Sequence, residues 1–368
     1  MAGRLIALDL PGGPAFVDAL RAVWDRGDTA LPVDQRVPQR ARTELFDAMR
    51  PSSVIDAAGD ESPLAGGRPT DERDALVVVT SGTTGIPKGV VLTHEAVAAS
   101  AIASSARLGV ATDDHWLACL PLSHVGGLSV VTRALHTGTR LTVVAGFDVG
   151  DVERSGATLV SLVSTALHRI DASRFRKILL GGARPPSGLP PNVVTTYGMT
   201  ETGSGVVYDG VPLDGVELRI VTGEVHIRCP MLLRCYRDGT SPLVDGWFAT
   251  GDGGRLDADG ELVVDGRIGE LIITGGENVW PQAVEAVLSR HPAVHDIAIA
   301  GRPDAEWGEV VVAYVVADDD PPSLDDLRDH VKASLPAYNA PRVLELVDEV
   351  PRTTLGKIVR TKSSRPIS

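Results

Sequence analysis

The sequence predicts an α/β protein with a large N-terminal domain of mainly parallel sheets and a small antiparallel, barrel-like part, plus a smaller C-terminal α+β domain. Three observations predict this class. Short β-branched runs alternate with helical segments as far as Tyr208, short strands and turns follow, and a further unit begins past Arg267. A length of 368 residues allows two or three domains and a sizeable buried core.

The parallel part becomes readable at Ala75, whereas residues 1–73 show little pattern. Ala75–Val79 is a continuous run of mostly β-branched residues, typical of a strand buried on both faces. A Gly/Thr/Ser loop follows, and Thr93 is then the expected N-cap of an Ala-rich helix that ends near Arg107. Further buried strands are predicted at residues 115–120, 140–144, 158–163 and 177–180.

The part beyond Tyr208 predicts short antiparallel strands, at residues 216–220, 224–227 and 261–264. A helix is then expected to begin at Pro281, with Val284, Val287 and Leu288 on one face. Ser323 is expected to cap a last helix, to about residue 335. Strands at 294–300, 309–316 and 343–347 complete this C-terminal unit.

The charge balance excludes two classes of partner. Lys and Arg number 35 against 48 Asp and Glu, so the net charge is −13 at pH 7. Broad binding to nucleic acid or to an anionic membrane needs basic surface, and we expect neither partner. Any anionic ligand must therefore be met by local cations or by backbone N–H groups.

Cysteine usage and hydropathy predict a cytoplasmic protein. Cys119, Cys229 and Cys235 show no C-x-x-C spacing, which argues against a disulfide framework or a zinc site and fits a reducing compartment. No uncharged apolar run approaches the roughly 18 residues of a membrane-spanning helix. The apolar start of the chain meets Asp9 before the hydrophobic region of a signal peptide could form.

A glycine-rich loop, Thr80-Ser-Gly-Thr-Thr-Gly-Ile-Pro-Lys-Gly89, follows the first readable strand. Its glycines let the backbone approach a polyphosphate, hydroxyls of Ser81, Thr83 and Thr84 can donate to it, and Lys88 supplies a point charge. The spacing matches neither G-x-x-x-x-G-K-[ST] nor G-x-G-x-x-G. A loop without a ligand is the alternative, but the strand before it, the lysine within it and the capped helix after it favour phosphate binding.

This loop resembles the signature loop of the adenylate-forming superfamily of acyl-CoA synthetases, aryl-CoA ligases and peptide-synthetase adenylation domains. Further segments repeat the resemblance in the family's order: Pro121–Gly127, Gly181–Ala183, Thr196–Thr202, Trp247–Asp252, Gly266–Arg267, Gly275–Asn278 and Pro351–Lys357. The match covers roughly residues 75–360, and so many motifs in order rarely coincide by chance. The resemblance implies ATP, Mg²⁺ and coenzyme A (CoA) as participants.

The resemblance also implies three binding sites. The ATP site would comprise Thr80, Ser81, Gly82, Thr83, Thr84, Gly85, Lys88, Gly181, Gly182, Ala183, Thr196, Tyr197, Gly198 and Met199, with Asp252 and Arg267 at the ribose. The acid would contact Ser123, His124, Gly127, Gly182, Tyr197 and Ser204, and CoA would contact Gly275, Gly276, Glu277 and Asn278. Without the resemblance, Asp252 would read as a β-turn residue and Arg267 as a surface residue.

Four residues are expected to act in catalysis: Lys357, His124, Thr200 and Glu201. A free carboxylate is a poor acceptor for a thiol because its leaving group would be oxide, whereas an acyl-adenylate releases AMP. Adenylation spreads negative charge over phosphate oxygens, so positioning and electrostatics dominate. Lys357 would neutralise that charge, Glu201 beside Thr200 would hold Mg²⁺, and His124 would close the acyl pocket by shape rather than act as a base.

Each of these assignments has a structural alternative. Glu201 could be a first-turn helix residue, Lys357 a solvated residue near the chain end, and His124 a packed side chain. The surrounding motifs favour the functional reading for Glu201 and Lys357.

One position departs from the family pattern. The hinge, two residues after Arg267, is usually Asp or Lys in relatives and is Gly269 here. Glycine permits wide backbone rotation, so we expect a mobile C-terminal catalytic-lysine domain, residues 270–368, to rotate about a hinge at 267–269. The N-terminal ATP- and acyl-binding domain would be residues 1–266. Rotation is needed because Lys357 and the CoA loop lie on one domain yet serve successive steps.

The short part before Thr80 and the Thr196–Thr202 segment make the chain resemble, within the superfamily, the o-succinylbenzoate–CoA ligases of menaquinone biosynthesis. Such an enzyme joins the succinyl carboxylate to CoA and needs a cation or hydroxyl donors for the ring carboxylate. Candidates are Ser123, Ser204, Arg133 and Arg184. The alternatives are another aryl or short-chain acid–CoA ligase, an acyl-AMP ligase loading a carrier protein, and a non-catalytic nucleotide- or acyl-binding regulator. A homodimer is left open as the assembly.

Overall fold

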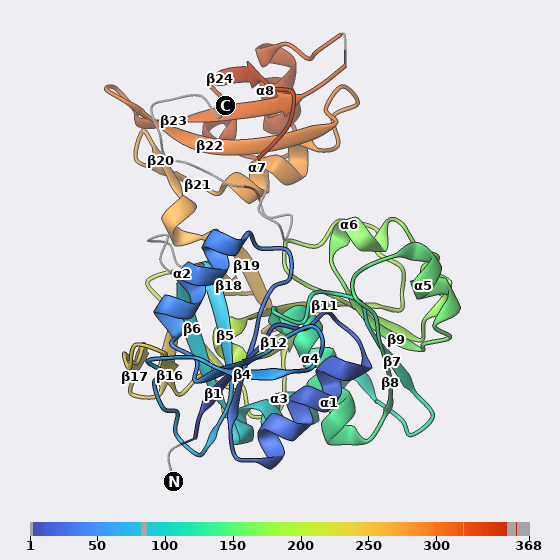
Figure 1. Cartoon of the computed structure of the whole chain (residues 1–368). Helices are drawn as coiled ribbons and strands as arrows, with labels where there is room; N and C mark the ends of the chain where they lie inside the picture. The colour runs from blue at the N-terminus through green and yellow to red at the C-terminus, as the bar shows by residue number, and fades with distance from the viewer. Residues whose placement is uncertain (1–2, 82–86, 319, 352–357, 359–368) are drawn as a thin grey trace. The chain divides into compact units, whose positions relative to one another are not determined.

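The structure is a computed structural model that describes residues 3–81, 87–318, 320–351 and 358. The chain forms two compact units, which are considered separately: residues 1–218 with 227–248, and residues 219–226 with 249–368 (Figure 1). Both units combine strands and helices, so the predicted α/β class is confirmed. The expected hinge at 267–269 lies inside the second unit and stays a prediction.

The first sheet of the first unit has seven strands in the order β16-β6-β5-β2-β1-β3-β4. They are β1 (Leu5–Leu8), β2 (Thr29–Pro32), β3 (Ser53–Ile55), β4 (Glu61–Pro63), β5 (Asp74–Ser81), β6 (Pro87–Thr93) and β16 (Cys235–Tyr236). β1 pairs in parallel with β2 and β3, and β2 with β5. β4, β6 and β16 are antiparallel to their neighbours, so only the centre of the sheet is parallel.

The second sheet also has seven strands, in the order β13-β12-β11-β10-β9-β7-β8. They are β7 (His115–Ala118), β8 (Arg140–Val143), β9 (Leu159–Leu162), β10 (Lys177–Leu180), β11 (Val193–Met199), β12 (Ser204–Tyr208) and β13 (Val211–Pro212). The strands from β7 to β11 pair in parallel, and β12 and β13 add an antiparallel edge. The four strands predicted between residues 115 and 180 are thus confirmed, with ends shifted by at most two residues.

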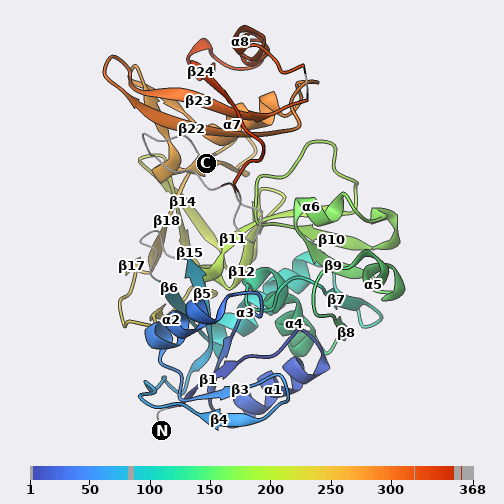
Figure 2. The same cartoon turned by 45° about the horizontal axis from the view of Figure 1, so that its top comes forward.

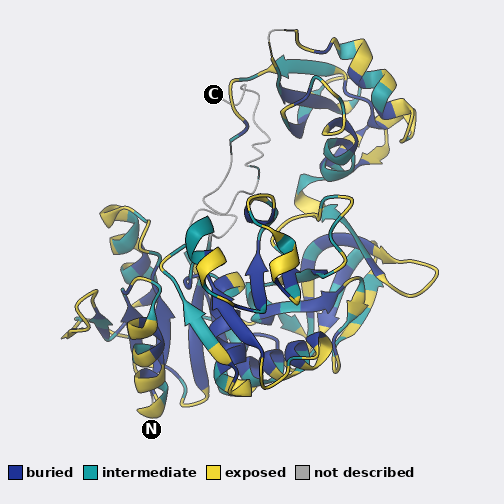
Figure 3. Ribbon diagram, turned by 90° about the vertical axis from the view of Figure 1, so that its right-hand side faces the viewer, coloured by how far each residue is buried: buried dark blue, intermediate teal, exposed yellow. Residues whose placement is uncertain are grey.

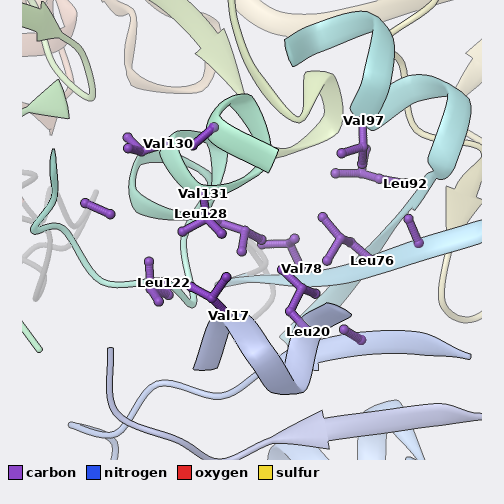
Figure 4. Packing of buried hydrophobic residues seen from close by; sticks show 14 of the residues in the cluster. Val17, Leu20, Leu76, Val78, Leu92, Val97, Leu122, Leu128, Val130 and Val131 are labelled. Carbon is purple, nitrogen blue, oxygen red and sulfur yellow. The ribbon is translucent and has the colours of Figure 1, made fainter. Parts of the chain in front are cut away.

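Two helices pack between these sheets, α3 (His94–Leu108) and α4 (Val125–Thr137). One hydrophobic cluster joins Leu76 of β5 and Leu92 of β6 to Val97 of α3 and Leu128 of α4 (Figure 4). Trp116 of β7 belongs to the same cluster. The remaining helices of the unit are α1 (Pro14–Asp25), α2 (Gln39–Met49), α5 (Val149–Arg154), α6 (Ser164–Leu167) and the 3₁₀ turns η1 (Ala172–Arg174) and η2 (Thr200–Thr202). A central helical layer therefore connects the two sheets into one core.

Both faces of each sheet are covered, which explains the continuous apolar runs. In β1, Ile6 and Leu8 join the cluster with α1, whereas Leu5 and Ala7 face the cluster that includes α2. The outer face of the second sheet packs against α5 and α6 (Figure 2). Figure 3 shows the strands buried and the covering helices exposed along one side.

The helix after the glycine-rich loop begins where predicted, but the loop does not lead directly into it. Thr93 is the N-cap of α3, and its Oγ1 accepts a hydrogen bond from Ala96 N at 3.1 Å. Before it, Pro87–Thr93 forms β6, antiparallel to β5, with Ser81 opposite Pro87. The loop thus joins two antiparallel strands. The sequence expectation missed β6 because Val90–Leu92 is too short to show a period.

A third sheet has the order β14-β15-β18-β17, with β19 beside β18. Its strands are β14 (Glu217–Val221), β15 (Glu224–Arg228), β17 (Leu243–Val244), β18 (Trp247–Leu256) and β19 (Leu262–Arg267). The pairs β17–β18 and β18–β19 are antiparallel, as the turn-rich sequence predicts. The division between the two units falls within β18.

The C-terminal part of the second unit is a sheet of order β21-β20-β23-β22, with β24 beside β23. Its elements are η3 (Ile268–Glu270), β20 (Ile272–Thr274), β21 (Glu277–Val279), α7 (Pro281–Leu288), β22 (Asp296–Asp304), β23 (Gly308–Val316), α8 (Leu324–Lys332), η4 (Ala337–Asn339) and β24 (Val343–Leu346). Val284, Leu288 and Leu327 bury the helices against the sheet. Pro281 occupies the first turn of α7 and Ser323 caps α8, as predicted, although α8 ends three residues before 335.

None of the helices in the described ranges combines the length and the apolar character that crossing a membrane requires.

An ion pair fastens the segment before β16 onto the first sheet. The carboxylate of Asp74 accepts hydrogen bonds from Arg234 Nε and Nη2, both at 2.8 Å, and its side chain is 1% exposed. Removing one partner of a buried pair leaves an uncompensated charge and costs about 3–5 kcal/mol. We expect Arg234→Met to lower the free energy of unfolding by about 3 kcal/mol, measured by urea denaturation.

The matched control is Arg40→Met, which breaks the pair with Glu44 on the surface of α2, where the two side chains are 91% and 57% exposed. Exposed pairs contribute about 1 kcal/mol or less. Equal decreases in the free energy of unfolding in the two variants would show that burial does not strengthen the contribution of the Asp74–Arg234 pair.

Candidate functional site

The ends of β5 and β6 carry the described part of the predicted phosphate loop. Thr80 and Lys88 lie opposite each other, and Thr80 Oγ1 donates to the carbonyl of Lys88 at 3.5 Å. Lys88 is exposed, so its ammonium group is accessible to a ligand. Ser81 ends β5, and the predicted residues Gly82, Thr83, Thr84 and Gly85 lie outside the described part of the chain.

The predicted adenine-binding segments meet at the ends of two adjacent parallel strands. Gly181, Gly182 and Ala183 follow β10, and Thr196 and Tyr197 lie in the neighbouring strand β11. A Cβ on Gly181 would approach Thr196 Oγ1 to 2.7 Å, and Gly182 has a φ of +91°, so both positions suit glycine. The structure therefore brings these two segments together at the carboxyl edge of the second sheet, where ligands bind in open α/β sheets.

A tight turn between β11 and β12 presents Thr200 and Glu201. Met199 N donates to Thr202 Oγ1 at 3.0 Å, and the same hydroxyl donates to the carbonyl of Ser204 at 2.7 Å. Thr202 is fully buried, so its hydroxyl holds the turn from inside. A Cβ on Gly198 would come within 2.2 Å of the carbonyl oxygen of Ser204, which explains the glycine.

Tyr236 links two of the predicted residues and was missed by the sequence reading. Its hydroxyl donates to Glu201 Oε1 at 3.1 Å, and Lys88 Nζ lies 5.2 Å from the centre of its ring. Burial and the Glu201 carboxylate raise the pKa of Tyr236, so it remains a donor. No sequence signal marks this tyrosine, because it reaches the site only through the pairing of β16 with β6.

We expect Tyr236→Phe to weaken productive binding of magnesium–ATP, because the variant keeps the ring but loses the hydrogen bond to Glu201. A hydrogen bond to a charged group contributes about 1.5–3 kcal/mol. The KM for magnesium–ATP in ATP–pyrophosphate exchange should rise about tenfold. Tyr338→Phe, at an exposed tyrosine in the second unit, is the control and should leave this KM unchanged. An unchanged KM in Tyr236→Phe would contradict the expectation.

The start of α4 carries the predicted acyl-pocket residues. His124 directly precedes the helix, and its carbonyl accepts hydrogen bonds from Gly127 N at 3.1 Å and Leu128 N at 2.9 Å. A Cβ on Gly127 would come within 2.4 Å of the carbonyl oxygen of Leu120, so the helix start packs directly on the chain before it. The Ser123 hydroxyl is buried and has no hydrogen-bond partner among the described residues.

A buried cation lies behind this helix start. Arg133 of α4 is 2% exposed. Its guanidinium donates to the hydroxyls of Ser104 at 2.8 Å, Ser129 at 3.1 Å, Ser204 at 2.5 Å and Tyr208 at 3.1 Å. In the described part of the chain these side-chain partners are all neutral. Among the described residues, Arg133 therefore forms hydrogen bonds with hydroxyl groups and no ion pair with a carboxylate. Arg184, the other candidate cation, lies exposed after β10.

The predicted ribose pair lies in the second unit and is brought together by strand register. Asp252 of β18 and Arg267 of β19 lie directly opposite, and Arg267 Nε is 2.9 Å from Asp252 Oδ1. Arg267 Nη1 also donates to the carbonyl of Thr250 at 3.0 Å, and Asp252 N donates to Thr250 Oγ1 at 3.0 Å. The carboxylate is buried, and a buried, oriented Asp–Arg pair can accept from and donate to vicinal hydroxyls.

The predicted CoA loop is a β-hairpin turn in the same unit. Gly275 and Gly276 have φ values of +59° and +83°, and Glu277 and Asn278 begin β21. Two consecutive positive φ angles define the tight hairpin turns that favour glycine. Gly275 N donates to the carbonyl of Trp307 at 2.9 Å, which ties the turn to the β22–β23 connection.

Two further predicted residues remain without a structural test. Gly269 lies in η3, where a Cβ would meet nothing within 4 Å, so the backbone there is not crowded. Lys357 lies outside the described residues. Its assigned role rests on the sequence motif.

The described residues fit magnesium delivered with a nucleotide better than a resident metal site. No group of three or more His, Cys, Asp or Glu side chains within the described ranges could hold a metal ion. Mg²⁺ requires only one or two carboxylates when phosphate oxygens and waters complete its octahedron. The partly buried Glu201, held by Tyr236, supplies one such carboxylate.

Comparison with protein families places two domains along the chain. The family described as AMP-binding enzyme matches residues 57–280, and the family described as AMP-binding enzyme C-terminal domain matches residues 283–357. Together these matches include every segment on which the sequence resemblance rests.

Similar known proteins extend the comparison over nearly the whole chain. A probable 2-succinylbenzoate–CoA ligase of Mycobacterium tuberculosis is 42% identical, over 96% of this chain and 96% of that protein. A 2-succinylbenzoate–CoA ligase of Bacillus cereus is 35% identical, over 97% of this chain and 87% of that protein. A solved structure of the o-succinylbenzoate CoA synthetase from Bacillus subtilis, in complex with its acyl-adenylate intermediate, has a TM-score of 0.85 at 30% identity, covering 97% of this chain and 87% of that chain.

Proposed function

The chain belongs to the AMP-binding enzyme family, and from this premise we propose that it joins the succinyl carboxylate of 2-succinylbenzoate to CoA at the expense of ATP. The observation that carries the proposal is the 42% identity to a probable 2-succinylbenzoate–CoA ligase over 96% of both chains. The buried cation Arg133 supports the same acid from the geometry. The predicted family and the predicted class of AMP-forming acid–thiol ligase are confirmed.

The reaction has two steps, the first at the α-phosphorus of ATP and the second at the acyl carbon. A carboxylate oxygen of the acid attacks the α-phosphorus of ATP, and the bond to the β-phosphate oxygen breaks, which releases pyrophosphate and leaves the acyl-adenylate. The sulfur of CoA then attacks the acyl carbon, AMP leaves with the electron pair of the acyl–oxygen bond, and the thiol proton passes to solvent. AMP is the better leaving group because its phosphate carries the charge.

The residues of the two units are proposed to divide this work. In the first unit, Thr80 and Lys88 bind phosphates and Glu201 holds the magnesium ion that arrives with ATP. In the second unit, Asp252 and Arg267 bind the ribose, and the Gly275–Gly276 turn receives the thiol. Lys357 is proposed to neutralise the charge that develops during adenylation.

The second carboxylate of the acid explains the chemistry of Arg133. A buried ionised group is costly unless it is paired, and four hydroxyls stabilise a guanidinium without neutralising it. A dianionic acid would supply the missing negative charge. Ser204 and Ser123 are proposed to complete the contacts, because Ser204 already touches Arg133 and the Ser123 hydroxyl is buried without a partner in the described chain.

An acid panel tests the proposal. Pyrophosphate release is measured with 2-succinylbenzoate, with benzoate, with short-chain acids and with no acid, and CoA consumption is then measured with each active acid. We expect 2-succinylbenzoate to give the highest kcat/KM, and CoA to be consumed in equal amount. Pyrophosphate release with another acid only would favour a different acid–CoA ligase. Pyrophosphate release without CoA consumption would favour an acyl-AMP ligase that loads a carrier protein. A cytoplasmic location and a homodimer stay predictions.

A further inference from the structure

We infer that Asp34 is a positioning residue for the acyl pocket: its carboxylate holds the imidazole of His124 at the start of α4, and so sets how the acid is enclosed. This inference rests on the proposed function, because the pocket is the one that receives the acid. It assigns a role to the N-terminal part of the chain, which the sequence left without one.

The contact joins residues that are far apart in the sequence. His124 Nε2 lies 3.4 Å from Asp34 Oδ2, and the two side chains are 29% and 14% exposed. The backbone of His124 is fixed by the first hydrogen bonds of α4, so its remaining freedom is rotation of the ring. The carboxylate beside Nε2 favours this ring orientation when the imidazole is protonated, because the ring then loses an ion-pair contact if it turns away.

Asp34 is itself held rigidly, which a positioning group requires. Its Oδ1 accepts from the backbone N of Arg36 at 3.0 Å and from Arg36 Nε at 2.8 Å, and its Oδ2 accepts from Arg36 Nη2 at 2.6 Å. These hydrogen bonds outweigh burial and lower the pKa of Asp34 to about 2. The carboxylate is therefore ionised and oriented near neutral pH.

The topology places this pair where ligands meet α/β sheets. Asp34 follows β2 in the first sheet, and His124 follows β7 in the second sheet, so both come from the carboxyl ends of parallel strands. Asp9 follows β1 at the same edge of the first sheet and is held by Gln35 Nε2 and Arg42 Nη1, each at 2.5 Å. Gly12, in the same loop as Asp9, approaches the chain after β8 so closely that a Cβ would lie 2.6 Å from the carbonyl oxygen of Val144.

Asp9 offers a matched control within this edge. It is a carboxylate on the adjacent strand end, and it accepts hydrogen bonds from Gln35 and from its own arginine, Arg42. If the edge only stabilises the fold, neutralising Asp9 and neutralising Asp34 should have similar effects. If Asp34 acts on the acid through His124, only Asp34 should change acid binding.

The experiment is a double-mutant cycle on the full chain, with Asp34→Asn, His124→Phe and both together, and with Asp9→Asn as the control. The KM for 2-succinylbenzoate and for ATP, kcat and the thermal midpoint are measured for each. We expect Asp34→Asn to raise the acid KM about 5- to 10-fold, to leave the ATP KM and kcat within twofold, and to have no further effect in the His124→Phe background. Asp9→Asn should leave the acid KM within twofold.

Several outcomes would overturn the inference. One is that Asp34→Asn raises the acid KM equally in the unsubstituted and His124→Phe backgrounds. The others are that it raises the ATP KM as much as the acid KM, or that Asp9→Asn raises the acid KM to the same extent. If Asp34→Asn does not fold, Arg36→Gln is used instead, because it frees the carboxylate of Asp34 without removing it. Arg36→Gln must then raise the acid KM in the unsubstituted background and have no further effect in the His124→Phe background. If the unsubstituted chain shows no turnover, the proposed function is wrong and this inference with it. If the chain is active but the effects of Asp34→Asn and His124→Phe on the acid KM are additive, the inference alone is wrong.

Discussion

Replacing Lys357 with alanine is expected to abolish formation of the acyl-adenylate while largely sparing its conversion to the thioester. Two anions, the acid and the α-phosphate of ATP, must approach each other in the first step, and the transition state gathers charge on phosphate oxygens. An ammonium group at that point neutralises the charge, and removing one such donor typically costs about 10²–10³ in rate, or about 3–4 kcal/mol. The second step starts from an acyl-adenylate whose charge is already relieved.

The two half-reactions separate the role of Lys357 from an effect on folding. ATP–pyrophosphate exchange reports the first step, and thioester formation from supplied acyl-adenylate and CoA reports the second. Lys362→Ala is the matched control, since this lysine lies five residues further along the same terminal segment. We expect it to leave both rates unchanged. Equal loss of both half-reactions in Lys357→Ala would contradict the assignment.

Replacing Arg133 with lysine is expected to raise the KM for 2-succinylbenzoate about 100-fold. Lysine retains a positive charge but cannot reproduce the fork that contacts Ser104, Ser129 and Ser204 together. Weakening a buried, hydrogen-bonded charge pair costs about 2–5 kcal/mol, and about 1.4 kcal/mol corresponds to tenfold in affinity. The KM for ATP should change much less. Steady-state pyrophosphate release measures both constants.

A second acid provides the control for Arg133. 3-Benzoylpropionate has the same reacting carboxylate but lacks the ring carboxylate, so its kcat/KM should be low in the unsubstituted chain and change less than threefold in Arg133→Lys. The substitution should therefore abolish the preference for the dianionic acid. Parallel losses with both acids would instead assign Arg133 to the packing of α4.

Local sequence signals predicted the elements whose causes are local. Thr93 caps α3 through its own hydroxyl, Pro281 starts α7, and β-branched runs form strands buried on both faces. The ribose pair was predicted from motifs, and the register of β18 and β19 explains how Asp252 and Arg267 meet. These features depend on a few neighbouring residues or on one hairpin.

Features that depend on distant partners were not predictable from the sequence. Tyr236 reaches Glu201 because β16 pairs with β6, and Asp34 reaches His124 because strand ends of two sheets converge. The described residues 3–73 form four strands and two helices, although their short elements show little periodicity. The conformation of these elements depends on burial against distant parts of the chain. The local sequence pattern does not show which distant residues they will contact.

The antiparallel strand β6 has a consequence for how a polyphosphate would bind at the predicted phosphate loop. β6 inserts seven residues between that loop and α3, which places the start of the helix roughly 20 Å along the strand. The field of a helix macrodipole fades within its first turn, so a polyphosphate at the loop gains nothing from it. Beside the proposed magnesium ion and Lys357, amide groups, hydroxyls and the exposed ammonium of Lys88 would have to compensate the phosphate charge, and mobile counter-ions screen such groups readily. Nucleotide affinity should therefore fall more steeply with ionic strength here than in loops that open directly into a helix.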